Sequence, residues 1–168
     1  ARYYTDFLAH ESCGKCIPCR EGLRRMLDIL TDICNGRGRK GDIELLEDLS
    51  EVLREASLCA LGKSAANPVM STIQYFRDEY EAHILEKRCP SLMCNKLIQY
   101  SIDEEKCVGC GICEKSCPTG AVSKVGDKLY AIDESKCIQC NACFAACPEK
   151  FSAVQKTDAT VKTEEMAA

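Results

Sequence analysis

Residues 107–118 read Cys-Val-Gly-Cys-Gly-Ile-Cys-Glu-Lys-Ser-Cys-Pro, and residues 137–148 read Cys-Ile-Gln-Cys-Asn-Ala-Cys-Phe-Ala-Ala-Cys-Pro. The two stretches space four cysteines and a proline identically. Each also follows a matching lead-in, which begins at Ile102 in the first copy and at Ile132 in the second. A motif that recurs with its flanking sequence indicates an internal duplication. The two copies therefore predict one compact domain over roughly 100–150.

The cysteine content points to bound metal rather than to disulfides. The chain has 15 cysteines among 168 residues, and most of them lie in three tight runs. Gaps of two residues suit thiolates that converge on one metal centre, whereas disulfide frameworks spread cysteines over longer loops. Metal-binding thiolates must stay reduced, so the sequence predicts an intracellular, cytoplasmic protein. The net charge of −4 argues against general nucleic-acid binding, and no apolar run is long enough to span a bilayer.

The duplicated runs have the C-x2-C-x2-C-x3-C-P spacing of bacterial two-cluster ferredoxins. Three closely spaced thiolates reach three irons of one [4Fe–4S] cubane, and in this pattern the fourth cysteine binds the other cluster. Zinc knots, the alternative, need paired CxxC hairpins and leave the duplication unexplained. The predicted ligands of one cluster are Cys107, Cys110, Cys113 and Cys147. Those of the other are Cys137, Cys140, Cys143 and Cys117.

A third run near the start of the chain has only three cysteines, Cys13, Cys16 and Cys19. A cubane needs a fourth thiolate, and two cysteines are candidates for it. Cys59 lies at a predicted helix end beside a glycine, where the backbone can bend toward the run. Cys34 also ends a predicted helix, but it lies at the edge of an apolar stripe, where buried cysteines are common. The position of Cys59 makes it the better candidate.

Hydrophobic periodicity predicts three helices around this run. One covers 20–34, a second is capped by Asp42, and a third covers about 68–87. Short connections between them favour a small helical bundle beside the cluster. In the carboxy-terminal half, residues 121–132 predict a hairpin that turns at Gly126-Asp127.

The predicted fold class is mainly α plus a small α+β part: a helical bundle that binds one [4Fe–4S] cluster, then a bacterial two-cluster ferredoxin-like domain. The predicted boundaries are a bundle at 1–88, a linker with a candidate zinc site at 89–99, a ferredoxin-like domain at 100–150 and a disordered tail at 151–168. The tail prediction rests on polar, charged residues without periodicity.

His83, Cys89 and Cys94 form a separate candidate site. Their H-x5-C-x4-C spacing is too loose for the cubane pattern but fits a structural zinc ion. A fourth ligand is needed, and Cys34 and Glu79 are the candidates. The alternative is a satisfied histidine at a helix end with two incidental thiols.

The sequence offers no catalytic constellation. His10 and His83 are the only histidines, and neither lies in a pattern that pairs a nucleophile with a base. The chain is therefore predicted to perform no bond chemistry by itself.

The stretches Glu11-Ser-Cys-Gly-Lys-Cys-Ile-Pro-Cys-Arg-Glu-Gly22 and Leu58-Cys59-Ala-Leu-Gly62 resemble the cluster-binding end of the NADH-binding flavoprotein subunit of complex I. The resemblance covers roughly 1–88. In that family the cluster is held by the three clustered cysteines and the later one, which implies that Cys59, not Cys34, is the fourth ligand.

The predicted two-cluster ferredoxin-like domain, at roughly 100–150, extends the chain beyond this resemblance. That extension is similar to the one in the diaphorase subunit of soluble NAD(P)-linked iron-only hydrogenases, including the electron-bifurcating ones. NAD-linked formate dehydrogenases are close competitors. The hydrogenase resemblance also implies a zinc site between bundle and ferredoxin domain. It further implies FMN and NAD(P) sites upstream, because no residue here matches those of the family.

The function implied is electron transfer through three [4Fe–4S] clusters, between an upstream FMN and NAD(P)H site and other partners. Those partners are iron–sulfur subunits of a hetero-oligomeric hydrogenase complex, or soluble ferredoxin. Two alternatives remain open. One is a scaffold that metal stabilises without redox activity, and the other is an isolated ferredoxin-type carrier.

Overall fold

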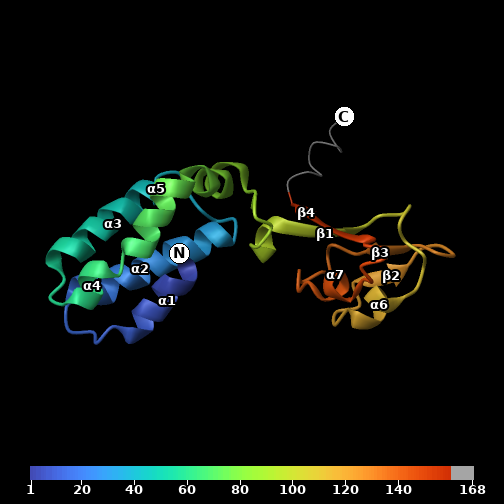
Figure 1. Cartoon of the computed structure of the whole chain (residues 1–168), viewed down its shortest axis with the longest axis horizontal. Helices are drawn as coiled ribbons and strands as arrows, with labels where there is room; N and C mark the ends of the chain where they lie inside the picture. The colour runs from blue at the N-terminus through green and yellow to red at the C-terminus, as the bar shows by residue number, and fades with distance from the viewer. Residues whose placement is uncertain (160–168) are drawn as a thin grey trace. The chain divides into compact units, whose positions relative to one another are not determined.

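The structure is a computed structural model that describes residues 1–159, and it divides into two compact units (Figure 1). One unit comprises Ala1–Arg88, and the other begins at Cys89. The first unit is helical, whereas the second combines two short helices with two small antiparallel sheets. This arrangement confirms the predicted fold class of a mainly α part followed by a small α+β part.

The first unit is built from five α-helices that end in a π-helical turn. Two of them, α1 (Arg2–Glu11) and α4 (Ala60–Ser64), have no counterpart among the predicted helices. Of these, α4 is too short to show a periodic pattern. The helices are α1 (Arg2–Glu11), α2 (Ile17–Cys34), α3 (Asp42–Ala56), α4 (Ala60–Ser64) and α5 (Asn67–Glu81), and the π turn is η1 (Ala82–Glu86).

The apolar stripes of α2 and α3 face each other and form the core of this unit. Leu23 and Met26 of α2 and Leu46 and Leu53 of α3 are completely shielded from solvent. Gly22 packs so closely on Leu53 that a Cβ atom has no room there. Burial of each large apolar side chain stabilises the fold by about 1.5–3 kcal/mol, so this core sets the helix arrangement.

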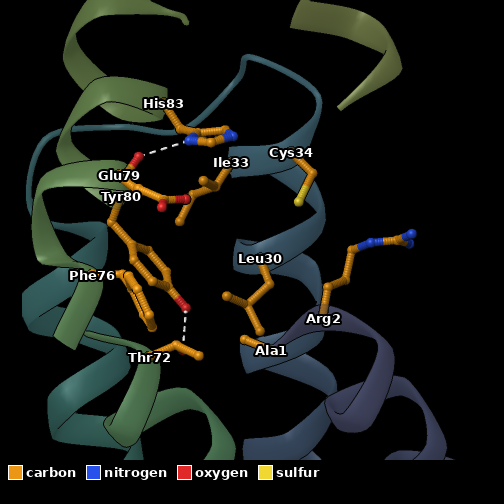
Figure 2. A pocket seen from close by; sticks show the side chains of 10 residues that line it. All are labelled: Ala1, Arg2, Leu30, Ile33, Cys34, Thr72, Phe76, Glu79, Tyr80 and His83. Atoms are coloured by element: carbon orange, nitrogen blue, oxygen red, sulfur yellow. Dashed lines mark hydrogen bonds between the residues drawn. The ribbon is translucent and has the colours of Figure 1, made fainter. Parts of the chain in front are cut away.

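The last helix of the first unit departs from the single helix predicted over 68–87. The backbone of α5 is kinked at Phe76, where φ is −137° and ψ is 38°. One turn before the kink, the Thr72 hydroxyl lies 2.9 Å from the carbonyl oxygens of Pro68 and Val69 and 2.8 Å from the Tyr80 hydroxyl (Figure 2). Hydroxyls that bond back to the preceding turn bend helices, and such contacts are invisible to periodicity.

The second unit shows the duplication as two matching halves. A short 3-10 helix, η2 (Asn95–Leu97), leads into β1 (Ile98–Ile102). That strand pairs antiparallel with β4 (Val154–Asp158), and β2 (Val122–Lys124) pairs antiparallel with β3 (Tyr130–Ile132). The hairpin predicted within 121–132 thus corresponds to β2 and β3. The helices α6 (Ile112–Ser116) and α7 (Ala142–Ala146) each lie within one cysteine run and carry its third cysteine.

The prediction of a disordered tail from residue 151 is wrong for the described part of that segment. In β4, Asp158 faces Ile98 of β1 and Val154 faces Ile102 across the ladder. The strand is continued by a bond from the amide of Ala159 to the carbonyl oxygen of Leu97. Its polar residues gave no strand signal, because the partner strand that stabilises it lies far away in sequence. Residues 160–168 lie outside the described residues.

The segment predicted as a linker at 89–99 is part of the second unit. The Cys89 amide donates to a carboxylate oxygen of Asp158 at 3.1 Å, and β1 already begins at Ile98.

No helix within residues 1–159 is long and apolar enough to cross a membrane.

Candidate metal centres

The two cysteine runs of the second unit line two cavities in a crosswise manner. One cavity is lined by the first three cysteines of the first run together with the last cysteine of the second run. The other is lined by the reverse combination. The cysteines of the first cavity are Cys107, Cys110, Cys113 and Cys147. Those of the second cavity are Cys137, Cys140, Cys143 and Cys117.

Local backbone geometry produces this crossing. Gly111 (φ 73°) and Asn141 (φ 69°) adopt left-handed conformations that start α6 and α7, and so curl each run around its own cavity. The fourth cysteine then leaves the helix in an extended conformation, with ψ of 112° at Cys117 and 124° at Cys147. A following proline disfavours helical geometry at the residue before it, so both Cys-Pro pairs turn the fourth thiol away from its own run.

A tyrosine from the opposite repeat covers each cavity. Tyr100 lines the cavity of the second run, and its hydroxyl donates to the side-chain oxygen of Asn141 at 2.9 Å. Tyr130 lines the cavity of the first run, where its hydroxyl leaves no space for a side chain at Gly111. The cysteine motifs alone do not point to these tyrosines, but Tyr100 and Tyr130 occupy equivalent positions of the two repeats, and that equivalence could have identified them.

The thiols of these sites differ in how readily they ionise. Burial raises the pKa of the Cys143 thiol to about 11, and it also raises the pKa of Cys113. Burial disfavours ionisation of Cys117 as well, but hydrogen bonds from the Thr119 hydroxyl and nearby backbone amides outweigh it and lower its pKa. Buried thiols become thiolates when a metal supplies the compensating positive charge. A set of four such sulfur donors fits an iron–sulfur cluster.

The third site starts in the loop before α2. Gly14 takes a left-handed conformation (φ 74°), and the Arg20 guanidinium donates to its carbonyl oxygen at 2.7 Å. Cys16 caps α2, and the buried Cys19 lies in its first turn, 3.3 Å from the Ser12 hydroxyl. The loop therefore wraps three thiols around the start of one helix.

The segment before α4 approaches the same helix start. Hydrogen bonding from the backbone of Leu58 lowers the pKa of the Cys16 thiol. A Cβ built on Gly62 would lie 3.3 Å from the Cβ of Cys19. Cys59 caps α4 between these two contacts, so it lies in the segment that packs against the end of α2 carrying Cys16 and Cys19.

Cys34 lies at the opposite end of α2. At 1.5 Å per residue, the helical rise from Cys19 to Cys34 is about 22 Å, which is too far for both thiols to bind one cluster. Helix geometry thus favours Cys59 over Cys34 as the fourth ligand.

The candidate zinc ligands lie together in one short segment. The ligand atoms of His83, Cys89 and Cys94 are all within 4.8 Å of one another. The Glu79 carbonyl oxygen lies 2.7 Å from Nδ1 of His83, which assigns the proton to Nδ1 and makes Nε2 the candidate metal-binding nitrogen (Figure 2). A histidine oriented in this way with two thiols is a donor set that zinc prefers.

The Cys89 sulfur already accepts several hydrogen bonds. The backbone amides of Met93 and Cys94 lie 3.3 Å and 3.4 Å from it, and the Ser91 hydroxyl lies at 3.5 Å. Burial disfavours the thiolate, but the Ser91 hydroxyl and these amides outweigh that effect and lower the pKa of Cys89 to about 7. The backbone therefore prepares Cys89 as a thiolate ligand.

Cys34 and Glu79 both line a cavity of about 350 Å³ in the first unit, and His83 lines it too. Figure 2 shows Cys34 on α2 and His83 on the facing helical segment. The structure leaves both Cys34 and Glu79 as candidates for the fourth zinc ligand.

The three cysteine-lined sites place the chain in the class of proteins that bind several [4Fe–4S] clusters. Comparison with known families agrees. Residues 1–83 match the NADH-ubiquinone oxidoreductase-F iron-sulfur binding region, and residues 100–123 and 131–154 each match a 4Fe-4S binding domain. Residues 1–83 thus match the iron–sulfur region of that family, and two ferredoxin-like motifs follow it in this chain.

Curated relatives share this part of the sequence. The chain is 44% identical to the NADP-reducing hydrogenase subunit HndC of Solidesulfovibrio fructosivorans, over 73% of this chain and 25% of that protein. It is 48% identical to the F subunit of the NADH-quinone oxidoreductase of Streptomyces coelicolor, over 52% of this chain and 19% of that protein. The chain thus spans at most a quarter of the length of these relatives.

A solved NAD+-reducing [NiFe]-hydrogenase in the H2-reduced state is 40% identical over 49% of this chain and 14% of its own, with a TM-score of 0.48. That score is too low to support an argument about the fold.

Proposed function

We propose that this chain is the carboxy-terminal, cluster-bearing part of an NAD(P)H-linked oxidoreductase subunit. In this proposal, electrons pass between an upstream FMN and NAD(P)H site and partner iron–sulfur subunits or ferredoxin. The observation that carries it is the pair of cavities in which three cysteines of one run face the fourth of the other. When bound, [4Fe–4S] clusters exchange single electrons at potentials that their surroundings determine.

The proposed ligands are the twelve cysteines of the three sites. The bundle cluster takes Cys13, Cys16, Cys19 and Cys59. The ferredoxin-like clusters take Cys107, Cys110, Cys113 and Cys147, and Cys137, Cys140, Cys143 and Cys117.

Each proposed site combines buried and exposed thiols. Cys19, Cys113 and Cys143 are buried, and they hold the inner side of each site away from water. The exposed thiols lie on the outer side, where a redox partner can approach. They are Cys13, Cys59, Cys110 and Cys140. A site that is dry inside and open on one edge suits electron exchange with a docked partner.

A zinc ion held by His83, Cys89 and Cys94 is a second part of the proposal. Its role is structural, since structural zinc sites use four protein ligands and stabilise the segment that supplies them. Cys34 or Glu79 would complete the site.

The identity of the whole protein is proposed from its relatives. The NADP-reducing hydrogenase relative matches nearly three quarters of this chain, including residues beyond the bundle, which supports a hydrogenase subunit. We extend the proposal to a cytoplasmic, hetero-oligomeric hydrogenase of the electron-bifurcating kind. The same region of an NAD-linked formate dehydrogenase is the alternative. In either complex this chain alone performs no bond chemistry.

The decisive experiment is elemental analysis of the chain purified without oxygen. Three cubanes and one zinc site predict about 12 iron with matching sulfide and about one zinc per chain. About 8 iron would remove the bundle cluster from the proposal. Zinc without iron would overturn electron transfer altogether.

A metal-stabilised scaffold is the competing function, because small sites with buried thiols can also serve stability. A redox titration separates the two, since a scaffold gives no reversible signal. Reduction of the clusters by NADH only when the upstream flavin part is present would distinguish the proposed role from that of an isolated carrier.

A further inference from the structure

The hydroxyl of Ser57 is buried without a hydrogen-bond partner among the described residues. Ser57 is 3% exposed, and its Oγ is completely shielded from solvent. Other buried hydroxyls of the first unit are satisfied, as that of Ser50 is by the carbonyl oxygen of Leu46 at 2.6 Å. Buried polar groups in native proteins almost always have a partner, so an orphan hydroxyl indicates a group that binds there.

The position of Ser57 identifies that group. Ser57 ends α3 two residues before Cys59, and Leu58 between them donates from its backbone to the Cys16 thiol. A Cβ built on Gly62 would lie 2.6 Å from the Ser57 Oγ and 3.3 Å from the Cβ of Cys19. The hydroxyl is therefore buried where the Cys59 segment packs against the start of α2 that carries Cys16 and Cys19.

We propose that Ser57 donates a hydrogen bond to a sulfur atom of the cluster held by Cys13, Cys16, Cys19 and Cys59. This inference rests on the proposed function. Cluster thiolates and sulfides carry negative charge, and hydrogen bonds to charged acceptors are the strong ones. A hydroxyl can rotate its single proton toward such an acceptor, and no protein atom competes for it among the described residues.

The bond has a defined effect on redox behaviour. Reduction adds one negative charge to the cluster, so a donor to its sulfur stabilises the reduced form more than the oxidised form. Ser57 is thus a positioning residue that raises the reduction potential of the bundle cluster relative to the same site without it. The ferredoxin-like clusters use other cysteines and stay unaffected.

The test compares Ser57→Ala with Ser64→Ala in the full chain loaded with iron and sulfide. Ser64 is a matched control, because its hydroxyl bonds to the Ala60 carbonyl oxygen on the exposed face of α4. A redox titration followed by electron paramagnetic resonance reports each cluster. We expect Ser57→Ala to make reduction of the bundle cluster about tenfold less favourable, a downward shift of about 59 mV for one electron. We expect Ser64→Ala to shift no cluster.

Stability of the metal-free chain supplies a second readout. Alanine removes an unsatisfied hydroxyl, so the Ser57→Ala chain should be at least as stable as wild type without metal. An unchanged potential with full iron would overturn the inference. Loss of iron from this site supports the inference if the metal-free chain keeps its stability, and overturns it if that chain is destabilised. If the wild-type chain itself holds only about 8 iron, the proposed function fails first.

Discussion

Replacement of Gly62 by alanine tests how closely the Cys59 segment packs against the start of α2. Gly62 lies within α4, and the Cβ of an alanine there would lie 2.6 Å from both the Cβ and the Oγ of Ser57. It would also lie 3.3 Å from the Cβ of Cys19. The α4 segment would therefore have to move away from the helix that carries the loop cysteines.

Two effects of this substitution oppose each other. Alanine is favoured over glycine inside a helix by about 1 kcal/mol. Overpacking of a tight interior site costs about 1–3 kcal/mol. Because the close atoms belong to a short, buried side chain rather than to the far end of a flexible one, we expect overpacking to prevail. The expected net loss is up to about 2 kcal/mol in the free energy of unfolding of the first unit.

The assay is thermal unfolding of the metal-free chain, together with iron analysis of the loaded chain. A loss of 1 kcal/mol corresponds to about 4–8 °C in the unfolding temperature of a domain of this size. Displacement of Cys59 should also lower bound iron from about 12 to about 8 per chain. Gly126→Ala is the matched control, since the nearest atom to a Cβ there is the Leu129 Cβ at 3.7 Å.

A Gly62→Ala chain that keeps wild-type stability and about 12 iron would refute the described packing of Gly62 against Ser57 and Cys19. A similar loss in Gly126→Ala would show that the effect is not specific to this contact.

Three further substitutions test the other sites. Cys147→Ser should remove the cluster assigned to the first run and leave about 8 iron per chain, measured by iron analysis with paramagnetic resonance. His83→Ala should lower bound zinc well below one per chain and leave iron unchanged in elemental analysis, because the imidazole is one of few available ligands. Gly111→Ala should destabilise the second unit by about 1–3 kcal/mol in urea unfolding. Its left-handed φ of 73° disfavours alanine, and a Cβ would lie 2.9 Å from the Tyr130 hydroxyl.

Each of these has an outcome that contradicts it. Cys147→Ser and Cys117→Ser should remove different clusters, so the crosswise assignment fails if each variant loses the cluster of its own run. An unchanged zinc content in His83→Ala would exclude His83 as a ligand. The control variant is His10→Ala, because His10 is an exposed histidine on α1. Gly111→Ala with unchanged stability would mean that Tyr130 does not fill the space at Gly111.

The cysteine sites could be predicted because the short spacing of the cysteines along the chain indicates which thiols converge on one metal centre. Two-residue gaps bring three thiols to one centre, and the proline after Cys117 or Cys147 turns the fourth away, whatever the rest of the chain does. The same holds for His83, Cys89 and Cys94, which lie within one short segment. The position of Cys59 and the family resemblance already favoured it over Cys34, and the length of α2 adds a physical reason for that preference.

Features that depend on distant partners escaped prediction. The strand β4 exists because β1 pairs with it, and its own polar residues carry no strand pattern. The kink in α5 depends on the Thr72 and Tyr80 hydroxyls, which meet only when the helix bends. Spacing alone did not choose between Cys34 and Glu79 as the fourth zinc ligand, since neither lies within the segment that supplies the other three.

The amino-acid sequence by itself determined the [4Fe–4S] kind of cofactor and the mainly α plus α+β class. These properties follow from residue type and short-range spacing. Only the tertiary structure decided that Tyr100 lines the cavity of the opposite repeat and that the unpaired hydroxyl of Ser57 is buried against Gly62, which also packs near Cys19. The physical reason is that a cover or a hydrogen bond depends on distances between segments, which the folded core sets and local sequence does not encode.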